Sequence, residues 1–350
     1  MENRATGEIA SFDTEKLEEL TKIADNNEEE PINIEQAFLT VLPRWQHGEQ
    51  RCIDAKEKEL QCWDEFNTYE EVADEGQNTL GLVWVLVEKL INGKPGVKAR
   101  LAVRGDQEVV QDIRTDSPTV NKVNIKLFFL IAAAKGWNIK TCDVKSAFLQ
   151  GTPLDRDVFV RPPVERRIKG VIWKMNKRAY GFCDASRGFY LELSKTLIQL
   201  GCKQSKYDPA LYFWEDKNGC LGGQVLTHVD DLLHGSGTEE FEERIMKPLK
   251  KKFVFGSEEE TVFRYVGMGV EQKEGAIIEN QDHYLETIEV PEMEKYSDAK
   301  DLLSEKDQES FRGVVGKVGW LSNLSRPDVS FDTVVLSSKL GKATIMQSKC

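Results

Sequence analysis

An apolar segment with two adjacent carboxylates in its middle, QVLTHVDDLLHG at residues 224–235, constrains the fold more than any other stretch of the sequence. Burying one unpaired carboxylate is costly, and burying two like charges side by side costs more. Asp230 and Asp231 therefore either lie in a solvated turn between two strands, where Asp is favoured, or face a cation. The segment alone leaves both interpretations open.

The composition is that of a globular protein without a membrane span. The 350 residues are 40% hydrophobic and 30% charged, which suits two or three domains. The first residues are polar and acidic, unlike a secretory leader, and no apolar run approaches the roughly 18 residues that cross a bilayer. The seven cysteines form no C-x-x-C pair, so neither a zinc ribbon nor a disulfide framework is indicated. We expect an intracellular location and no membrane partner, while the oligomeric state stays unknown.

The net charge of −12 hides a basic block. Residues 1–80 hold 21 acidic and 7 basic side chains, a net of −14, and residues 191–350 carry −8. Between them, residues 81–190 hold 20 basic and 10 acidic side chains, a net of +10. A cationic surface of that size can hold a phosphate backbone, although a solvated surface is the alternative.

The apolar periodicity predicts a mixed α+β fold. Residues 1–30 read as a disordered acidic tail, and residues 31–78 as an extension with helices near 34–42 and 55–66. Next comes a strand hairpin around NGKPG at 92–96. Ser117 is the expected N-cap of a helix that Gly136 ends. The expected later elements are strands at 137–144, 157–163, 171–176, 210–215, 222–229, 262–270 and 276–279, and helices at 186–200, 238–252, 281–289 and 305–340.

The order of elements around the acids suits a split β-α-β palm, a ferredoxin-like arrangement. In such a sheet the strand ending at Asp143 can lie beside the hairpin that carries Asp230 and Asp231. Three converging carboxylates repel one another unless a cation lies between them, and Mg²⁺ takes oxygen ligands of this kind. Two such ions can activate a hydroxyl and stabilise a leaving pyrophosphate.

Beyond these acids, the chain carries an ordered set of motifs from about residue 79 to 340, roughly three quarters of its length. They are KARLAVRG (98–105), DSPTV (116–120), CDVKSAFLQG (142–151), VFVRPP (158–163), RAYGFCDASRGFY (178–190), DPALYF (208–213), HVDDLL (228–233), RYVGM (264–268) and VGWLSNLSRPDVSF (318–331). In this order they resemble a known family, the reverse transcriptase (RNA-directed DNA polymerase) domain of copia-type retrotransposon Pol polyproteins.

The resemblance implies a right-hand polymerase with fingers, palm and thumb. Fingers and palm would span 79–255, and the primer-grip hairpin, the thumb and the start of a connection region would span 256–350. In the family, acids matching Asp143, Asp230 and Asp231 hold two Mg²⁺ ions, with Mn²⁺ as an alternative ion. The Val144 carbonyl would be an additional ligand.

The resemblance also implies residues that bind the nucleotide and the primer. Lys98 and Arg100 match the basic pair that meets the incoming triphosphate, although a solvated strand face is the alternative. Phe148 matches the ring that excludes a 2′-hydroxyl, with a simple core role as the alternative. The remaining implied contacts are backbone amides near Ser146 and Ala147 for the triphosphate, Asp184 and Arg187 near nucleotide or template, and Tyr265, Val266, Gly267 and Met268 for the primer.

We therefore expect an RNA-directed DNA polymerase whose partners are an RNA or DNA template with primer and deoxynucleoside triphosphates, in cytoplasmic virus-like particles or the nucleus. Two departures favour an alternative, a nucleic-acid-binding relic with little or no activity. His228 replaces the usual Tyr before the acid pair, and Asp184 replaces an amide and brings another acid toward a triphosphate. The chain is also expected to be a fragment of a longer polyprotein or a host-encoded relic.

Overall fold

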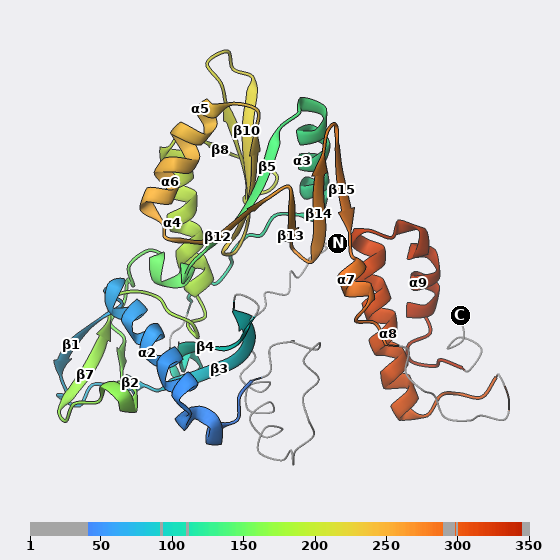
Figure 1. Ribbon diagram of the computed structural model, residues 1–350. Coiled ribbons are helices and arrows are strands. Elements are labelled where there is room, and N and C mark those ends of the chain that lie inside the picture. Colours follow the sequence, from blue (N-terminus) through green and yellow to red (C-terminus); the bar gives the residue numbers. More distant parts are fainter. Residues whose placement is uncertain (1–40, 92–93, 110–111, 290–297, 299, 345–350) are drawn as a thin grey trace. The chain divides into compact units, whose positions relative to one another are not determined.

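Figure 1 shows the computed structural model, which describes the chain except for residues 1–40, 92–93, 110–111, 290–297, 299 and 345–350. The expected tail at 1–30 and nearly all of the helix expected at 34–42 lie outside the described residues. The chain forms two compact units. Unit 1 comprises residues up to 119, 144–203 and 248–254, and unit 2 comprises 120–143, 204–247 and 255 onward.

Unit 1 combines a helical N-terminal part with two small sheets. Strands β3 and β4 form a hairpin, and a second sheet has the order β1-β7-β6-β2 (Figure 1). The elements are η1 (Arg44–Gly48), α2 (Gln50–Glu65), β1 (Tyr69–Ala73), β2 (Thr79–Leu80), β3 (Leu82–Ile91), β4 (Lys94–Val103), η2 (Gly105–Gln107), η3 (Ala147–Gln150), β6 (Phe159–Val160), η4 (Val164–Arg166), β7 (Val171–Met175) and α4 (Ala185–Gln199).

The core of unit 1 forms where α2 and the two sheets bury large apolar side chains. Trp63 of α2 and Trp173 of β7 are fully buried, and Tyr69 of β1 stacks on Trp173 with ring centroids 3.7 Å apart. The loop before α4 approaches β4 so closely that a Cβ at Gly181 would lie 1.9 Å from the Val103 carbonyl oxygen. Only glycine fits there, since its φ is also +93°.

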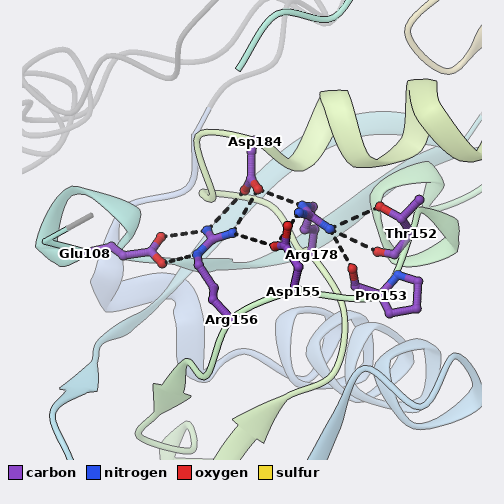
Figure 2. Close-up of polar contacts among 7 residues, drawn as sticks. All are labelled: Glu108, Thr152, Pro153, Asp155, Arg156, Arg178 and Asp184. Atoms are coloured by element: carbon purple, nitrogen blue, oxygen red, sulfur yellow. Dashed lines mark hydrogen bonds and ion pairs between the residues drawn. The ribbon is translucent and has the colours of Figure 1, made fainter. Parts of the chain in front are cut away.

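A buried network of charges lies beside the start of α4 (Figure 2). The Asp184 carboxylate is 3% exposed and accepts hydrogen bonds from Arg156 at 2.9 and 3.2 Å and from Arg178 Nε at 2.7 Å. Arg156 also donates to both oxygens of Glu108, and Arg178 donates to Asp155 at 2.9 Å. The network therefore connects the loop before α4 with two preceding loops of the unit.

Arg178 is held on its other side by backbone. Its Nη1 donates to the Pro153 carbonyl at 2.8 Å and to both oxygens of Thr152. A Cβ at Gly188 would lie 2.4 Å from Arg178 Cδ, so glycine in α4 leaves room for the guanidinium stem.

Unit 2 is built on a six-stranded sheet of order β12-β5-β11-β10-β9-β8 and a three-stranded sheet, β13-β14-β15. Strand β8 and helix α6 extend across the boundary with unit 1, and β5 ends one residue into it. The elements are α3 (Lys122–Lys135), β5 (Asn138–Val144), β8 (Lys203–Gln204), β9 (Leu211–Glu215), β10 (Leu221–His228), β11 (Asp231–Ser236), α5 (Glu239–Phe241), η5 (Glu242–Met246), α6 (Lys247–Lys252), β12 (Phe255–Glu260), β13 (Val262–Tyr265), β14 (Met268–Lys273), β15 (Ala276–Asn280), α7 (Asp282–Leu285), α8 (Glu305–Leu324), η6 (Pro327–Val329) and α9 (Ser330–Ser337).

The apolar face of α3 and the two sheets share one core. Phe128 and Phe129 of α3 pack with Ile139 of β5, Leu226 of β10 and Leu233 of β11. Helix α3 ends as expected at Gly136, which has a left-handed φ of 63°. None of the helices in the described part of the chain is long and apolar enough to cross a membrane.

Both units mix helices with sheets, which confirms the predicted α+β class, but details of the prediction differ. The expected N-cap of α3 at Ser117 is wrong. Asn121 caps the helix by accepting a 2.8 Å hydrogen bond from the Val123 amide, while residues 117–120 lie outside any helix or strand. Strands β12 and β1 were not predicted, because FGSEEE and YEEVA lack a clear apolar alternation.

We predict that Asp184→Asn lowers the free energy of unfolding by about 3 kcal/mol, since it leaves two arginines without their shared carboxylate. Urea unfolding measures this value. Burial alone would raise the pKa of Asp184, but hydrogen bonds from Arg156 and Arg178 outweigh it and hold this pKa below its usual range. A lowered folded pKa gives stability that is present above about pH 4 and lost as the pH falls through the folded pKa.

The difference between the parent and Asp184→Asn should therefore be constant near neutral pH and shrink in acid. Asp155→Asn is the matched control, because the Asp155 side chain is 77% exposed and an exposed pair contributes at most about 1 kcal/mol. A cost for Asp184→Asn no greater than that of the control would contradict the prediction.

Candidate active site

The acid pair lies in a tight turn between two buried strands. Strands β10 and β11 pair in antiparallel register from Gly223 opposite Ser236 to His228 opposite Asp231, which leaves Val229 and Asp230 as the turn. The flanking leucines Leu226 and Leu233 are fully buried. The sequence alternative of a turn is thus confirmed as geometry, and the turn carries both acids.

The backbone of this turn is strained. Val229 has a φ of +56°, a left-handed conformation that is rare for a β-branched residue. Strain of this kind persists only where the surrounding structure imposes it, and it is concentrated at functional sites. Strands β10 and β11, which flank the turn and pair with each other, hold the backbone in this conformation.

The third acid is brought to the pair by strand β5. Strands β11 and β5 are antiparallel neighbours, and Asp231 lies directly opposite Asp143. Directly opposite residues in antiparallel strands point to the same face of the sheet. Burial, and then the negative charges of Asp230 and Asp143, raise the pKa of Asp231 to about 6. The three carboxylates predicted from the sequence are therefore close enough to repel one another.

This repulsion bears on whether a metal fits. Carboxylate oxygens are the ligands that Mg²⁺ prefers, and a divalent cation would relieve the repulsion. Within the described residues, however, no group of three or more His, Cys, Asp or Glu side chains is gathered closely enough to hold a metal as it stands. The donor chemistry fits a divalent ion, and the assignment of Asp143, Asp230, Asp231 and the Val144 carbonyl as ligands stays a prediction.

His228 is the residue opposite Asp231 at the base of the turn. Its Nδ1 is buried without a hydrogen-bond partner among the described atoms. Burial lowers the pKa of His228 more than the charge of Asp230 raises it. The ring is therefore neutral at pH 7, and it adds no positive charge beside the acids.

Two of the predicted nucleotide-binding residues converge on Tyr180 in unit 1. The Arg100 guanidinium lies over the Tyr180 ring, 5.2 Å from its centroid, and Phe148 meets the same ring edge-on at 4.9 Å. Phe148 is half-buried and packs against the unit 1 core, so its ring is both core and partly accessible. Tyr180 was missed as a site residue, although it stands inside a matching motif and its aromatic type was the available signal.

The other residues predicted near the triphosphate lie on the same two segments. Lys98 alternates with buried Val97 and Ala99 along β4, so it shares the face of Arg100. Ser146 has a left-handed φ of +50° just before η3, and Ala147 is buried at the start of that helix. The backbone thus turns at Ser146 and Ala147, the two residues whose amides are predicted to contact the triphosphate.

The structure changes the interpretation of Asp184. Its carboxylate is neutralised by Arg156 and Arg178 (Figure 2), so it is not the uncompensated acid that the sequence suggested. Arg187, three residues later, donates to Asp116 at 2.8 Å. A pocket of about 430 Å³ adjoins these residues, lined by Asp112, Ile113, Arg114, Asp155, Arg156, Arg178, Asp184, Arg187, Gly188 and Leu191. Each of its four arginines is paired with a carboxylate.

The predicted primer hairpin is formed by β13 and β14, with Tyr265 opposite Met268. Both of these side chains are buried in the unit 2 core, at 2% and 1% exposure. Val266 and Gly267 form the turn, both with left-handed φ values. The buried pair therefore anchors the hairpin, and the assignment of Tyr265, Val266, Gly267 and Met268 as primer contacts stays a prediction.

Comparison with known proteins identifies relatives for most of the chain. The family model described as reverse transcriptase (RNA-dependent DNA polymerase) matches residues 66–297. A retrovirus-related Pol polyprotein from transposon RE1 of Arabidopsis thaliana is 25% identical over 67% of this chain and 17% of its own length. The corresponding polyprotein from RE2 of the same plant is 24% identical over 76% of this chain and 19% of its own length.

A third relative, from transposon TNT 1-94 of Nicotiana tabacum, is 28% identical over 52% of this chain. A solved foamy viral protease-reverse transcriptase, in complex with double-stranded DNA, matches with a TM-score of 0.44 and 10% identity over 95% of this chain and 53% of that chain. The chain thus spans less than a fifth of the length of the two Arabidopsis polyproteins. As the ordered motifs predicted, the chain belongs to the reverse transcriptase (RNA-dependent DNA polymerase) family, with relatives among transposon Pol polyproteins.

Proposed function

We propose that the chain is the polymerase core of a copia-type transposon polyprotein and extends a primer on an RNA or DNA template. The observation that carries this proposal is the pairing of Asp143 with Asp231 across β5 and β11, beside Asp230 in a strained turn. Family membership supports the reaction class, and the register of β5 and β11 supports the turn at Asp230 as its location. The right-hand division into fingers, palm and thumb is part of the same proposal.

Asp143, Asp230 and Asp231 would hold two divalent ions, and the Val144 carbonyl would add a ligand. When bound, such ions activate the primer hydroxyl and neutralise the leaving pyrophosphate. The protein's part is to fix the carboxylates on paired strands, so that little reorganisation is needed during the reaction. No side-chain general base is required.

The residues around Tyr180 would bind the incoming nucleotide. Arg100 and Lys98 present positive charge on one face of β4, which suits a triphosphate. Phe148 would pack against the sugar and leave no room for a 2′-hydroxyl. The turn at Val266 and Gly267 would meet the primer, and the Arg187–Asp116 pair would lie near the template.

The alternative, a relic that binds nucleic acid without polymerising, rested on His228 and Asp184. Because two arginines balance the charge of Asp184, this residue no longer favours the alternative. His228 is neutral, so it adds no charge beside the three acids, all of which are present in the sequence. These observations support an active enzyme over the relic.

Primer extension on an RNA template with Mg²⁺ tests the proposal. We expect the parent to incorporate deoxynucleotides and Asp230→Asn to lose at least roughly 100-fold in rate, because a group that stabilises transition-state charge is removed. Asp157→Asn is the control, since that carboxylate is 73% exposed and forms a surface ion pair with Lys174. A parent that binds primer–template but never extends it would support the relic.

Binding to a primer–template should weaken steeply with salt. The basic block at 81–190 would displace counterions from phosphates, and about six phosphate contacts correspond to a loss of roughly 10³ in affinity between 50 and 200 mM salt. Fluorescence anisotropy with a labelled duplex measures the slope. An affinity that stays flat over this range would mean that the excess positive charge is only a solvated surface.

Phe148→Ala should admit ribonucleotides, because the ring that would exclude the 2′-hydroxyl is gone. It should also cost about 1.5–3 kcal/mol in the free energy of unfolding, since the ring packs on the core. Phe66→Ala is the matched control, because Phe66 is a half-buried ring on the same core cluster. The ratio of deoxynucleotide to ribonucleotide kcat/KM separates the roles, and an unchanged ratio in an active Phe148→Ala enzyme would place the sugar discrimination elsewhere.

A further inference from the structure

Tyr180, in the loop before α4, contacts two of the residues proposed to bind the incoming nucleotide. The Arg100 guanidinium lies over its ring, 5.2 Å from the centroid. The Phe148 ring meets it at 61° with the centroids 4.9 Å apart, an edge-to-face arrangement that aromatic pairs favour. Arg100 belongs to β4 and Phe148 to η3, so a single ring joins two separate elements of unit 1.

The backbone of Tyr180 is held against β4, the strand that carries Arg100. Its carbonyl accepts a 2.7 Å hydrogen bond from the amide of Val103, the last residue of that strand. The next residue, Gly181, lies so close to the strand that a Cβ there would be 1.9 Å from the Val103 carbonyl oxygen. The ring of Tyr180 therefore projects from a turn that two close contacts fix to β4.

Arg100 depends on this ring for its position. Its Nε is buried without a hydrogen-bond partner among the described atoms, and Arg100 makes no ion pair with a described residue. A cation over an aromatic face is attracted by the ring quadrupole, yet its charge is not neutralised. The guanidinium is thus ordered in advance while its charge stays available to a phosphate, which lowers the entropic cost of binding.

Phe148 lies on a short helix whose backbone is anchored, but its side chain is only half-buried. Gln150 of the same helix donates to the carbonyls of Lys145 at 2.6 Å and Val254 at 3.1 Å. The Tyr180 ring packs against the Phe148 ring itself. A ring can exclude a hydroxyl by its volume only if it does not move aside, and Tyr180 is the neighbour that restrains it.

We infer that Tyr180 is a positioning residue whose ring sets the place of both Arg100 and Phe148. The inference rests on the proposed function, in which Arg100 meets the triphosphate and Phe148 the sugar of the same nucleotide. One ring then determines how tightly the nucleotide is bound and how well a 2′-hydroxyl is rejected. Loss of the ring affects the two properties together, each through a different neighbour.

The test compares Tyr180→Leu with the parent, both as the full chain, in primer extension on an RNA template with Mg²⁺. KM for the deoxynucleotide should rise about 10-fold, as for the loss of a partly buried cation–π contact. kcat should change less than about 2-fold, since the lost contact acts equally in the ground and transition states. The preference for deoxynucleotides over ribonucleotides in kcat/KM should fall about 5-fold. Nucleotide affinity of the complex with a chain-terminated primer, which involves no chemistry, should fall as KM rises.

Two further variants keep an aromatic ring at position 180. Tyr180→Phe should match the parent in KM and in sugar preference, because the ring is retained. Pentafluorophenylalanine in place of Tyr180 also keeps a ring but reverses the charge of its face, so KM should rise as it does in Tyr180→Leu. This variant tests the contact with Arg100 even if Tyr180→Leu does not fold.

Tyr69→Leu is the matched control, because Tyr69 is a half-buried ring of the same unit that stacks on Trp173. It should lower the melting temperature but leave KM and the sugar preference unchanged. Double variants assign each effect of Tyr180→Leu to one neighbour. Added to Arg100→Ala it should raise KM no further, and added to Phe148→Ala it should lower the sugar preference no further.

The outcomes distinguish the inference from the function on which it rests. If the parent extends a primer and Tyr180→Leu matches it in KM and sugar preference, only the inference is overturned. A Tyr180→Phe variant as impaired as Tyr180→Leu also overturns it, because the hydroxyl and not the ring would then matter. Losses that persist in full in both double variants, or that appear equally in Tyr69→Leu, overturn it as well, since they indicate a general packing role. A parent that cannot extend a primer overturns the proposed function and the inference with it.

Discussion

The repulsion among three carboxylates is the constraint on which the active-site region depends. Asp143 and Asp231 lie directly opposite each other in register on paired strands, and Asp230 adds a third negative charge at the turn. Such a group is unfavourable unless rigid neighbours hold it, and here those neighbours are the buried strands of the six-stranded sheet. Burial and the charges of the other two acids raise the pKa of Asp231 to about 6, in the direction that this repulsion requires. A divalent cation between the carboxylates would relieve this repulsion, and that relief would favour its binding.

In unit 1, by contrast, a buried carboxylate is neutralised by neighbouring arginines. Asp184, Arg156 and Arg178 neutralise one another, and Glu108 and Asp155 complete the set. Removing a single partner from such a network leaves an uncompensated charge, and the network links three loops of the unit. Asp184 is thus balanced by the protein's own arginines, whereas the proposed function assigns Asp143, Asp230 and Asp231 to divalent ions. This contrast is what separates a structural carboxylate from candidate catalytic ones in this chain.

Much of the fold could be predicted from local pattern. The β3–β4 hairpin, the helix ended by Gly136, the strand before Asp143 and the turn at Asp230 all carry strong apolar periodicity or turn residues. Strand β12 could not be predicted, because FGSEEE is polar and almost wholly exposed and pairs only because β5 presents a free edge. Asn121 caps the helix in place of Ser117, and its backbone N–H donates to the Asp208 carboxylate, 87 positions away. Tyr180 was missed because its role depends on two rings and a guanidinium brought together by folding.

The sequence by itself predicted that the two adjacent acids lie in a solvated turn or face a cation, and the order of its motifs indicated the family. Both conclusions depend on local chemistry and on the order of residues, which the chain carries without folding. Only the tertiary structure decided that Asp231 is in register with Asp143 and that Asp184 is neutralised by two arginines. These facts depend on strand register and on contacts between residues far apart in the chain. A shift of one residue in register would turn Asp231 to the opposite face of the sheet, and no local pattern records which register the folded core selects.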